Sequence, residues 1–195
     1  MTEFFEIENV FDDFDRVREY FDTATFEDKT NPVDGVVYPN IHEAIPEDIE
    51  LQLVDRINDA LADNLEVKEG IMFARLSPEG VEAPHQVHTD ISMGSHSCMV
   101  FLNRKEDCEG GTAFVQHETG LFHHPINDTD LDIWKRDCNI TDKWETVARC
   151  EMEPNKACIF NSVLMHRAEP VEGFGTNAKD GRLVLTFFFN IGEMH

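Results

Sequence analysis

Residues 182–190 read Arg-Leu-Val-Leu-Thr-Phe-Phe-Phe-Asn, a run of branched and aromatic residues that opens with an arginine. This composition predicts a β-strand. Because alternate side chains of a strand point to the same side, Arg182, Val184 and Thr186 should share one face. A guanidinium inside an apolar strand is costly unless an anion meets it, and its planar fork suits a carboxylate. The alternative is that Arg182 lies at the strand end and its guanidinium reaches water.

Upstream of this segment, from residue 70 on, short apolar runs with a period of two alternate with turn signals such as Ser77-Pro78-Glu79-Gly80. Many short strands without helices between them predict an all-β sandwich or barrel. Residues 117–145 lack a clean period and predict a long insertion, which often forms a lid or a binding loop. The expected strands are 70–76, 85–91, 97–103, 112–116, 146–152, 156–161 and 182–190.

The first 69 residues differ from the rest in being strongly acidic and in carrying helical periodicity. Ile49, Leu53 and Ile57 recur at helical spacing after Pro46, which predicts a helix over 46–64. We expect residues 1–69 to form an acidic arm and a supporting helix packed on a core made by residues 70–195. The alternative for the arm is a segment that docks a partner.

Two short motifs carry candidate metal ligands. In His88-Thr89-Asp90, residues two apart on an extended chain direct an imidazole and a carboxylate to the same side. His166, within Ser162-Val-Leu-Met-His-Arg-Ala-Glu-Pro170, is the best candidate for a third ligand. Two histidines and one carboxylate leave three adjacent positions of an octahedral ion open, as in non-heme Fe(II) oxygenases. A His-x-Asp triplet also occurs by chance, so a surface turn without a ligand role is the alternative.

The order of these motifs resembles the Fe(II)/2-oxoglutarate-dependent dioxygenase superfamily, in particular its prolyl-hydroxylase-like branch. The resemblance covers about residues 70–195. Residues 112–168 are also similar to a small acidic subgroup carried by phages and marine bacteria. The matching features, in chain order, are His88-x-Asp90, Phe101-Leu-Asn103, Gly110-Gly111-Thr112, His166 and Arg182-x-x-x-Thr186.

This resemblance implies a mainly β fold, a double-stranded β-helix or cupin-like jelly-roll with helices at its N-terminal side. It implies Fe(II) held by His88, Asp90 and His166, and 2-oxoglutarate held by Arg182 and Thr186. The implied activity is hydroxylation of a substrate with release of succinate and CO2. One departure is that many relatives place a 2-oxoglutarate-binding tyrosine on the third core strand, where this chain reads Cys98-Met-Val-Phe101.

Two other functions remain open from the sequence. The chain could be a cupin-like binding module that has the fold without turnover, and the missing tyrosine favours this alternative. It could also be a metal-dependent hydrolase that uses His85, His88 and Asp90, which would predict zinc and no need for Arg182.

Composition restricts the partners and the compartment. Of the 195 residues 39 are acidic and 16 basic, for a formal charge of −23, which argues against nucleic acid and against an anionic membrane surface. A small-molecule or peptide substrate is the remaining expectation. No apolar run approaches the roughly 20 residues of a membrane span. The five cysteines include no Cys-x-x-Cys pair, which predicts reduced thiols in a cytoplasmic protein.

Overall fold

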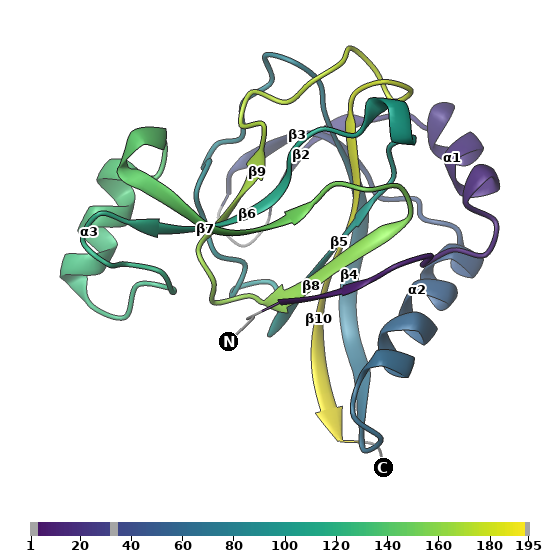
Figure 1. The fold of residues 1–195 in the computed structure, drawn as a ribbon, viewed down its shortest axis with the longest axis horizontal. Helices are drawn as coiled ribbons and strands as arrows, with labels where there is room; N and C mark the ends of the chain where they lie inside the picture. The colour runs from purple at the N-terminus through teal and green to yellow at the C-terminus, as the bar shows by residue number, and fades with distance from the viewer. Residues whose placement is uncertain (1–3, 32–34, 194–195) are drawn as a thin grey trace.

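The computed structural model describes residues 4–31 and 35–193, in which two antiparallel sheets form the larger part of the regular secondary structure (Figure 1). The larger sheet contains, in order across it, β1 (Phe4–Ile7), β8 (Lys156–Asn161), β5 (His96–Phe101), β10 (Arg182–Glu193), β4 (Leu65–Ser77), β3 (Val37–His42) and β2 (Glu27–Thr30). The smaller sheet contains β7 (Trp144–Glu151), β6 (Gly111–His117) and β9 (His166–Glu169). The strand-rich class expected from the sequence is confirmed.

The α-helices are α1 (Phe14–Asp22), α2 (Glu47–Ala60) and α3 (Asp128–Asp137), and Lys105–Asp107 and Thr141–Lys143 form 3-10 turns. Helix α2 begins directly after Pro46 and buries Ile49, Leu53 and Ile57, so the predicted helix is confirmed. Acidic side chains in its first turn lie where the partial positive charge of the helix N-terminus stabilises them. No helix within residues 4–31 and 35–193 is long and apolar enough to span a bilayer.

Strand β10 divides its side chains between two cores. Leu183, Leu185 and Phe187 pack in the core that also contains Leu53 and Ile57 of α2. Val184 instead packs with Phe114 and Cys150 of the smaller sheet, between the two sheets. Figure 1 shows α1 and α2 on one side of the larger sheet and β6, β7 and β9 on the other. The predicted common face of Arg182, Val184 and Thr186 is therefore the face toward the smaller sheet.

Two sequence predictions of local structure are wrong. Residues 85–91 do not form a strand; they are a loop with one isolated bridge, between His88 and His166. The two buried residues there, Val87 and Asp90, are three apart in the sequence, so burial does not follow the period of two that a strand would require. Residues 117–145 are not irregular throughout, because they contain α3, whose Asn127 side chain accepts a hydrogen bond from the backbone N–H of Asp130. Few apolar residues in α3 are fully buried, which explains the weak periodicity.

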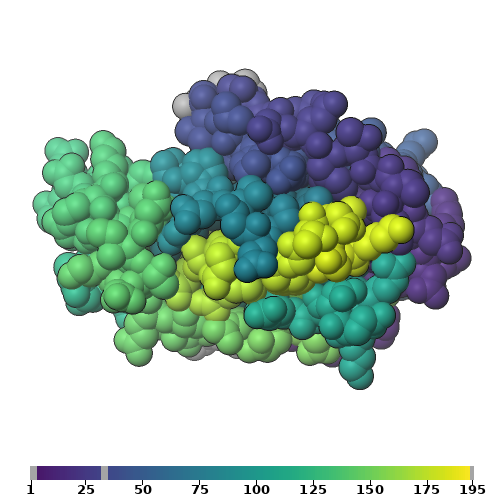
Figure 2. Space-filling model, turned by 90° about the horizontal axis from the view of Figure 1, so that it is seen from above, coloured from purple at the N-terminus to yellow at the C-terminus, as the bar shows by residue number. Residues whose placement is uncertain are grey.

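Residues 117–145 lie at one end of the molecule, next to the loop that follows β4 (green and teal in Figure 2). The indole of Trp134 in α3 donates a hydrogen bond to the carbonyl of Val87, at 2.8 Å. The buried His117 imidazole lies 3.0 Å from the Asp137 carboxylate, which ties the end of β6 to the end of α3. From the first 69 residues, β1 pairs with β8 and β3 pairs with β4, so this segment extends the larger sheet at both edges.

Asn155, in the turn before β8, fastens the N-terminal segment to the core. Its side chain accepts a hydrogen bond from the Phe11 N–H at 2.8 Å and donates one to the Phe11 carbonyl at 2.9 Å. Its φ of 59° lies in the left-handed region, which asparagine and glycine tolerate best.

We expect Asn155→Ala to lower the free energy of unfolding by about 2–4 kcal/mol, because two buried backbone groups lose their partners and alanine is strained at this φ. Asn155→Gly removes the same bonds without the strain and should cost about 1 kcal/mol less. Urea unfolding followed by circular dichroism measures both. An alanine variant as stable as the parent would contradict the assignment.

Candidate metal centre

The loop between β4 and β5 brings His88 and Asp90 to the start of β9. The His88 N–H donates to the His166 carbonyl at 3.1 Å, and the His166 N–H donates to the His88 carbonyl at 3.0 Å. The Asp90 N–H donates to the Ser162 carbonyl at 2.9 Å. These backbone bonds hold side by side two segments that are distant in the sequence. The side chains of His88 and Asp90 therefore converge although their segment is not a strand.

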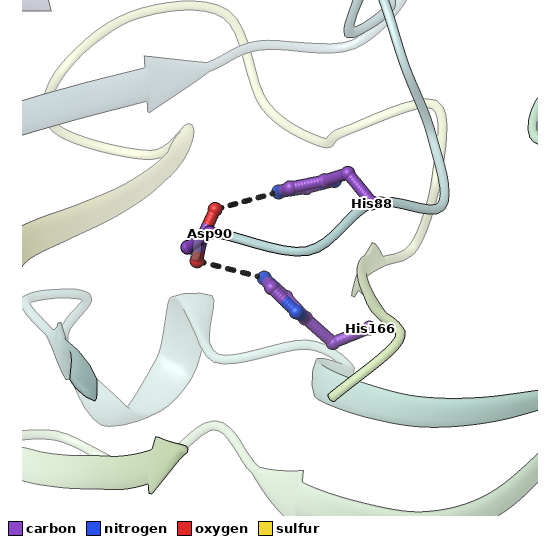
Figure 3. Close-up of side chains that lie close together, drawn as sticks. All are labelled: His88, Asp90 and His166. Carbon is purple, nitrogen blue, oxygen red and sulfur yellow. Dashed lines mark ion pairs between the residues drawn. The ribbon is translucent and has the colours of Figure 1, made fainter. Parts of the chain in front are cut away.

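Three side chains meet at this point (Figure 3). His88 Nε2 lies 3.5 Å from Asp90 Oδ1, and His166 Nε2 lies 3.1 Å from Asp90 Oδ2. One candidate ligand atom from each residue lies within 4.8 Å of the others. Asp90 and His166 are buried, while the His88 side chain is 30% exposed. The structure thus brings together the three residues that the sequence nominated.

The hydrogen bonds around the two imidazoles assign their tautomers. His166 Nδ1 donates to the Leu164 carbonyl at 2.9 Å, and His88 Nδ1 donates to the Gln86 carbonyl at 3.3 Å. In the neutral ring this leaves Nε2 of each histidine with its lone pair directed toward the carboxylate. His166 Nε2 is buried and has no hydrogen-bond partner of good geometry among the described residues. Lone pairs that face one carboxylate fit a bound cation, and carbonyl acceptors on the opposite nitrogens are usual for metal-ligating histidines.

The electrostatics of the group also suit a cation. Burial alone would raise the pKa of Asp90, but its interactions with His166 and His88 and the hydrogen bond from Ser97 lower it to about 2. Burial, and then the neighbouring His166, lower the pKa of His88 to about 4. Burial opposes protonation of His166, but Asp90 and the Leu164 carbonyl raise its pKa. At neutral pH the group therefore contains an ionised carboxylate and an unprotonated His88, both able to ligate a metal.

Two serines fix the carboxylate. Ser97 Oγ donates to Asp90 Oδ2 at 2.9 Å, and Ser162 Oγ lies 2.9 Å from Ser97 Oγ. Both serines are fully buried. The chain of hydrogen bonds sets the rotation of the Asp90 carboxylate, and the sequence analysis missed it because serine in a strand carries no distinctive signal.

Arg182 and Thr186 line the same small cavity as the three candidate ligands. The cavity measures about 80 Å³ and lies between the two sheets. Arg182 is 5% exposed; its Nη2 donates to the Gly111 carbonyl at 3.1 Å, and its Nε is buried without a partner among the described residues. Burial, with the nearby Arg75, lowers the pKa of Arg182 to about 10. Thr186 Oγ1 lies 3.5 Å from Met99 Sδ. The cavity thus has a guanidinium that forms no ion pair with a carboxylate of residues 4–31 and 35–193.

Asn103 sets the position of Arg182. Its side chain accepts a hydrogen bond from the Leu183 N–H and donates one to the Gly181 carbonyl, each at 2.8 Å. On β5, Met99 lines the cavity and Cys98 faces the helix-covered core. The side chain that β5 contributes to the cavity wall is therefore a thioether.

Arg75 is a site residue that sequence reasoning missed. It lies on β4, where Ala74 and Leu76 face the helices, and it lines the small cavity with Phe73. A lone arginine within Gly70-Ile-Met-Phe-Ala-Arg-Leu76 is the same signal that singled out Arg182, and it could have been found in the same way.

A larger cavity of about 280 Å³ adjoins the three candidate ligands on the side of His88. Its walls come from the loop that follows β4 and from residues 117–145. His85 lies here with its ring 5.3 Å from that of Trp134, and His124 Nδ1 lies 2.9 Å from Thr89 Oγ1. Neither belongs to the three-residue group that could hold a metal, as judged over the described residues.

No protein-family model and no curated protein matches the sequence. Solved structures do match it. HygX from Streptomyces hygroscopicus, with nickel and 2-oxoglutarate bound, is 16% identical and has a TM-score of 0.55, over 95% of this chain and 82% of that one.

Two further solved structures also match this chain. EctD from S. alaskensis, in its apoform, is 14% identical with a TM-score of 0.51, over 97% of this chain and 72% of that one. A prolyl hydroxylase from Trichoplax adhaerens, solved with a peptide fragment of hypoxia inducible factor, is 11% identical with a TM-score of 0.50, over 97% and 84%. The chain therefore shares the fold of these solved structures, a jelly-roll or double-stranded β-helix built from two antiparallel sheets.

Proposed function

We propose that the chain is an Fe(II)- and 2-oxoglutarate-dependent dioxygenase that hydroxylates a small-molecule or peptide substrate and releases succinate and CO2. One observation carries the proposal. Two imidazole Nε2 atoms and one carboxylate converge in the wall of a cavity that also holds a buried arginine without an acidic partner among the described residues. HygX has been solved with iron, as well as with nickel and 2-oxoglutarate.

In this proposal His88, Asp90 and His166 hold the iron. The Leu164 and Gln86 carbonyls accept a hydrogen bond from each Nδ1, so that in the neutral rings the Nε2 lone pairs face the iron position, and Ser97 holds the Asp90 carboxylate in one orientation. Two histidines and one carboxylate leave three adjacent positions for the cosubstrate and dioxygen. When bound, iron and 2-oxoglutarate supply the oxidising chemistry, and the protein supplies positioning and a site shielded from water.

Arg182 is proposed to bind the distal carboxylate of 2-oxoglutarate, with Thr186 as an additional donor. A buried guanidinium needs an anion, and Gly111 satisfies only part of its donors. Asn103 keeps the start of β10 in place, so the guanidinium is held ready before the cosubstrate arrives.

The two cavities suggest separate places for cosubstrate and substrate. Both contain His88 and Asp90 in their walls, but only the smaller contains Arg182 and Thr186. We propose that 2-oxoglutarate occupies the smaller cavity and that the substrate enters through the larger. Residues 117–145 supply Leu131 and Trp134 to the larger cavity, which supports a role in substrate choice for this insertion in the 70–195 core. Residues 1–69 would serve mainly as support.

Two alternatives are less well supported. A metal-dependent hydrolase that uses His85 would not need His166, yet His166 is the histidine grouped with His88 and Asp90. A binding module without turnover has no need for a buried, acid-free arginine beside three metal-competent side chains. Release of succinate from iron-loaded protein with 2-oxoglutarate would separate the proposed function from both.

The metal assignment can be tested by removing its ligands. His88→Ala and His166→Ala should each weaken Fe(II) binding by more than about a hundredfold, since even loss of an outer-shell partner costs about 10- to 100-fold. His124→Ala removes an imidazole from the neighbouring cavity and serves as the matched control, with affinity near that of the parent. Anaerobic calorimetric titration gives the constants. Parental affinity in both ligand variants would exclude the site.

Ser97→Ala should weaken Fe(II) binding by about 10- to 100-fold, because the Asp90 carboxylate loses the donor that orients it. Ser162→Ala leaves that donor in place and should have a smaller effect. Equal constants for the parent and the Ser97 variant, from the same titration, would show that the backbone alone orients Asp90.

Arg182→Ala should weaken 2-oxoglutarate binding by about 10- to 100-fold, because a hydrogen bond to a charged group contributes about 1.5–3 kcal/mol. Arg182→Lys keeps the charge without the fork and should be intermediate. Titration of 2-oxoglutarate under argon measures both, and Fe(II) affinity should stay near that of the parent. A folded Arg182→Ala protein that binds 2-oxoglutarate normally would place the anchor elsewhere.

A further inference from the structure

Arg75 borders the larger and the smaller cavity and also a third, narrower space beside Arg182. Its Nε atom is buried without a hydrogen-bond partner, and its Cζ lies 5.9 Å from the centroid of the Tyr38 ring. Within residues 4–31 and 35–193 it makes no ion pair with a carboxylate. A half-buried guanidinium in this state, like the buried one of Arg182, is stabilised by a bound anion.

The residues that line these three spaces include a single carboxylate, that of Asp90, as judged over the described residues. Both of its oxygens are already committed, Oδ1 toward His88 and Oδ2 toward His166 and Ser97. Asp90 therefore cannot serve as the partner of Arg75 while it also ligates a metal.

The charge balance of the loaded site, which rests on the proposed function, also leaves Arg75 without an anion. The positive charges of a divalent metal and Arg182 cancel the negative charges of the Asp90 carboxylate and the 2-oxoglutarate dianion. Arg75 then leaves one positive charge unmatched in the half-buried wall of the site. The metal and Arg182 already account for the two ends of 2-oxoglutarate.

The larger cavity offers the place for a compensating anion. Arg75 is its only lysine or arginine among the described residues, and Leu131, Trp134 and Met165 give it apolar walls. A chain with a formal charge of −23 repels anions in general, so a single guanidinium in the wall of a partly apolar cavity selects those that fit it.

We propose that the substrate of this site carries a carboxylate, and that Arg75 binds that carboxylate next to the metal centre. The planar fork of Arg75 and the apolar walls favour a small organic acid in which an apolar body accompanies the carboxylate. The proposal deepens the proposed function by naming the chemical class of its substrate.

Matched pairs of acids and amides test the proposal, because each pair differs in charge and hardly in shape. The pairs are acetate with acetamide, benzoate with benzamide and phenylacetate with phenylacetamide. They are titrated calorimetrically, under argon, into protein loaded with Mn(II) and the 2-oxoglutarate mimic N-oxalylglycine. At least one acid should bind about tenfold or more tightly than its amide. Arg75→Gln should abolish this preference, Arg75→Lys should keep part of it, and both should bind N-oxalylglycine as the parent does.

Three results would overturn the proposal. In the first, the parent binds acids and amides equally in all three pairs. In the second, the preference survives in Arg75→Gln, which would mean that the acid binds the metal directly. In the third, Arg75→Gln weakens N-oxalylglycine binding by as much as it weakens acid binding, which would make Arg75 a cosubstrate residue.

A second set of titrations separates failure of the substrate proposal from failure of the proposed function. The same pairs are titrated into metal-free Arg182→Gln protein and into the double variant Arg75→Gln/Arg182→Gln. An acid preference that is present in the first and absent in the second supports Arg75 as the anion site, even if the parent fails to bind N-oxalylglycine. Circular dichroism verifies that each variant is folded.

Discussion

The reciprocal backbone hydrogen bonds between His88 and His166 are the constraint on which the candidate site depends. They join a loop to the first residue of β9, so that two segments separated by most of the C-terminal half lie in contact. A backbone bridge fixes Cα positions and leaves the side chains free to rotate. The rotation is then set by the Leu164 and Gln86 carbonyls on the imidazoles and by Ser97 on the carboxylate. Position and orientation are thus controlled by different bonds.

Part of this arrangement could be predicted from the sequence. Helix α2 followed from the spacing of Ile49, Leu53 and Ile57, and the common face of β10 followed from its period of two, because both are local properties of the chain. The loop at 85–91 was mistaken for a strand because Val87 and Ile91 are β-formers, whereas the segment is held by contacts of Val87 and Asp90 with other parts of the chain, which the local pattern does not show. Helix α3 was missed because its apolar stripe is narrow, although Asn127 and the acids after it marked its start. Ser97 could not be found, since its role depends on tertiary contacts alone.

Charge is distributed in opposite ways on the surface and in the cavities. The chain is strongly acidic overall, yet the walls of the cavities carry two arginines and one carboxylate among the described residues. Burial disfavours the charged form of both arginines and lowers the pKa of each, which reflects the cost of keeping them there without an anion. A fold retains such a cost only where something compensates for it. The one carboxylate among the described wall residues, that of Asp90, is directed toward the two histidines, so bound anions are the compensation that the proposed function supplies.

Strand β10 couples the stability of the fold to the chemistry of the site. Leu183 and Leu185 belong to the helix-covered core, whereas Arg182, Val184 and Thr186 belong to the cavity. A slip of one residue in its pairing with β4 and β5 would exchange the two sets and bury Arg182 among the leucines. Asn103 opposes that slip, because its amide pairs with both Gly181 and Leu183 and so fixes the register at the strand's first residue. The large apolar core on one face therefore supplies the free energy that holds a charged group in place on the other.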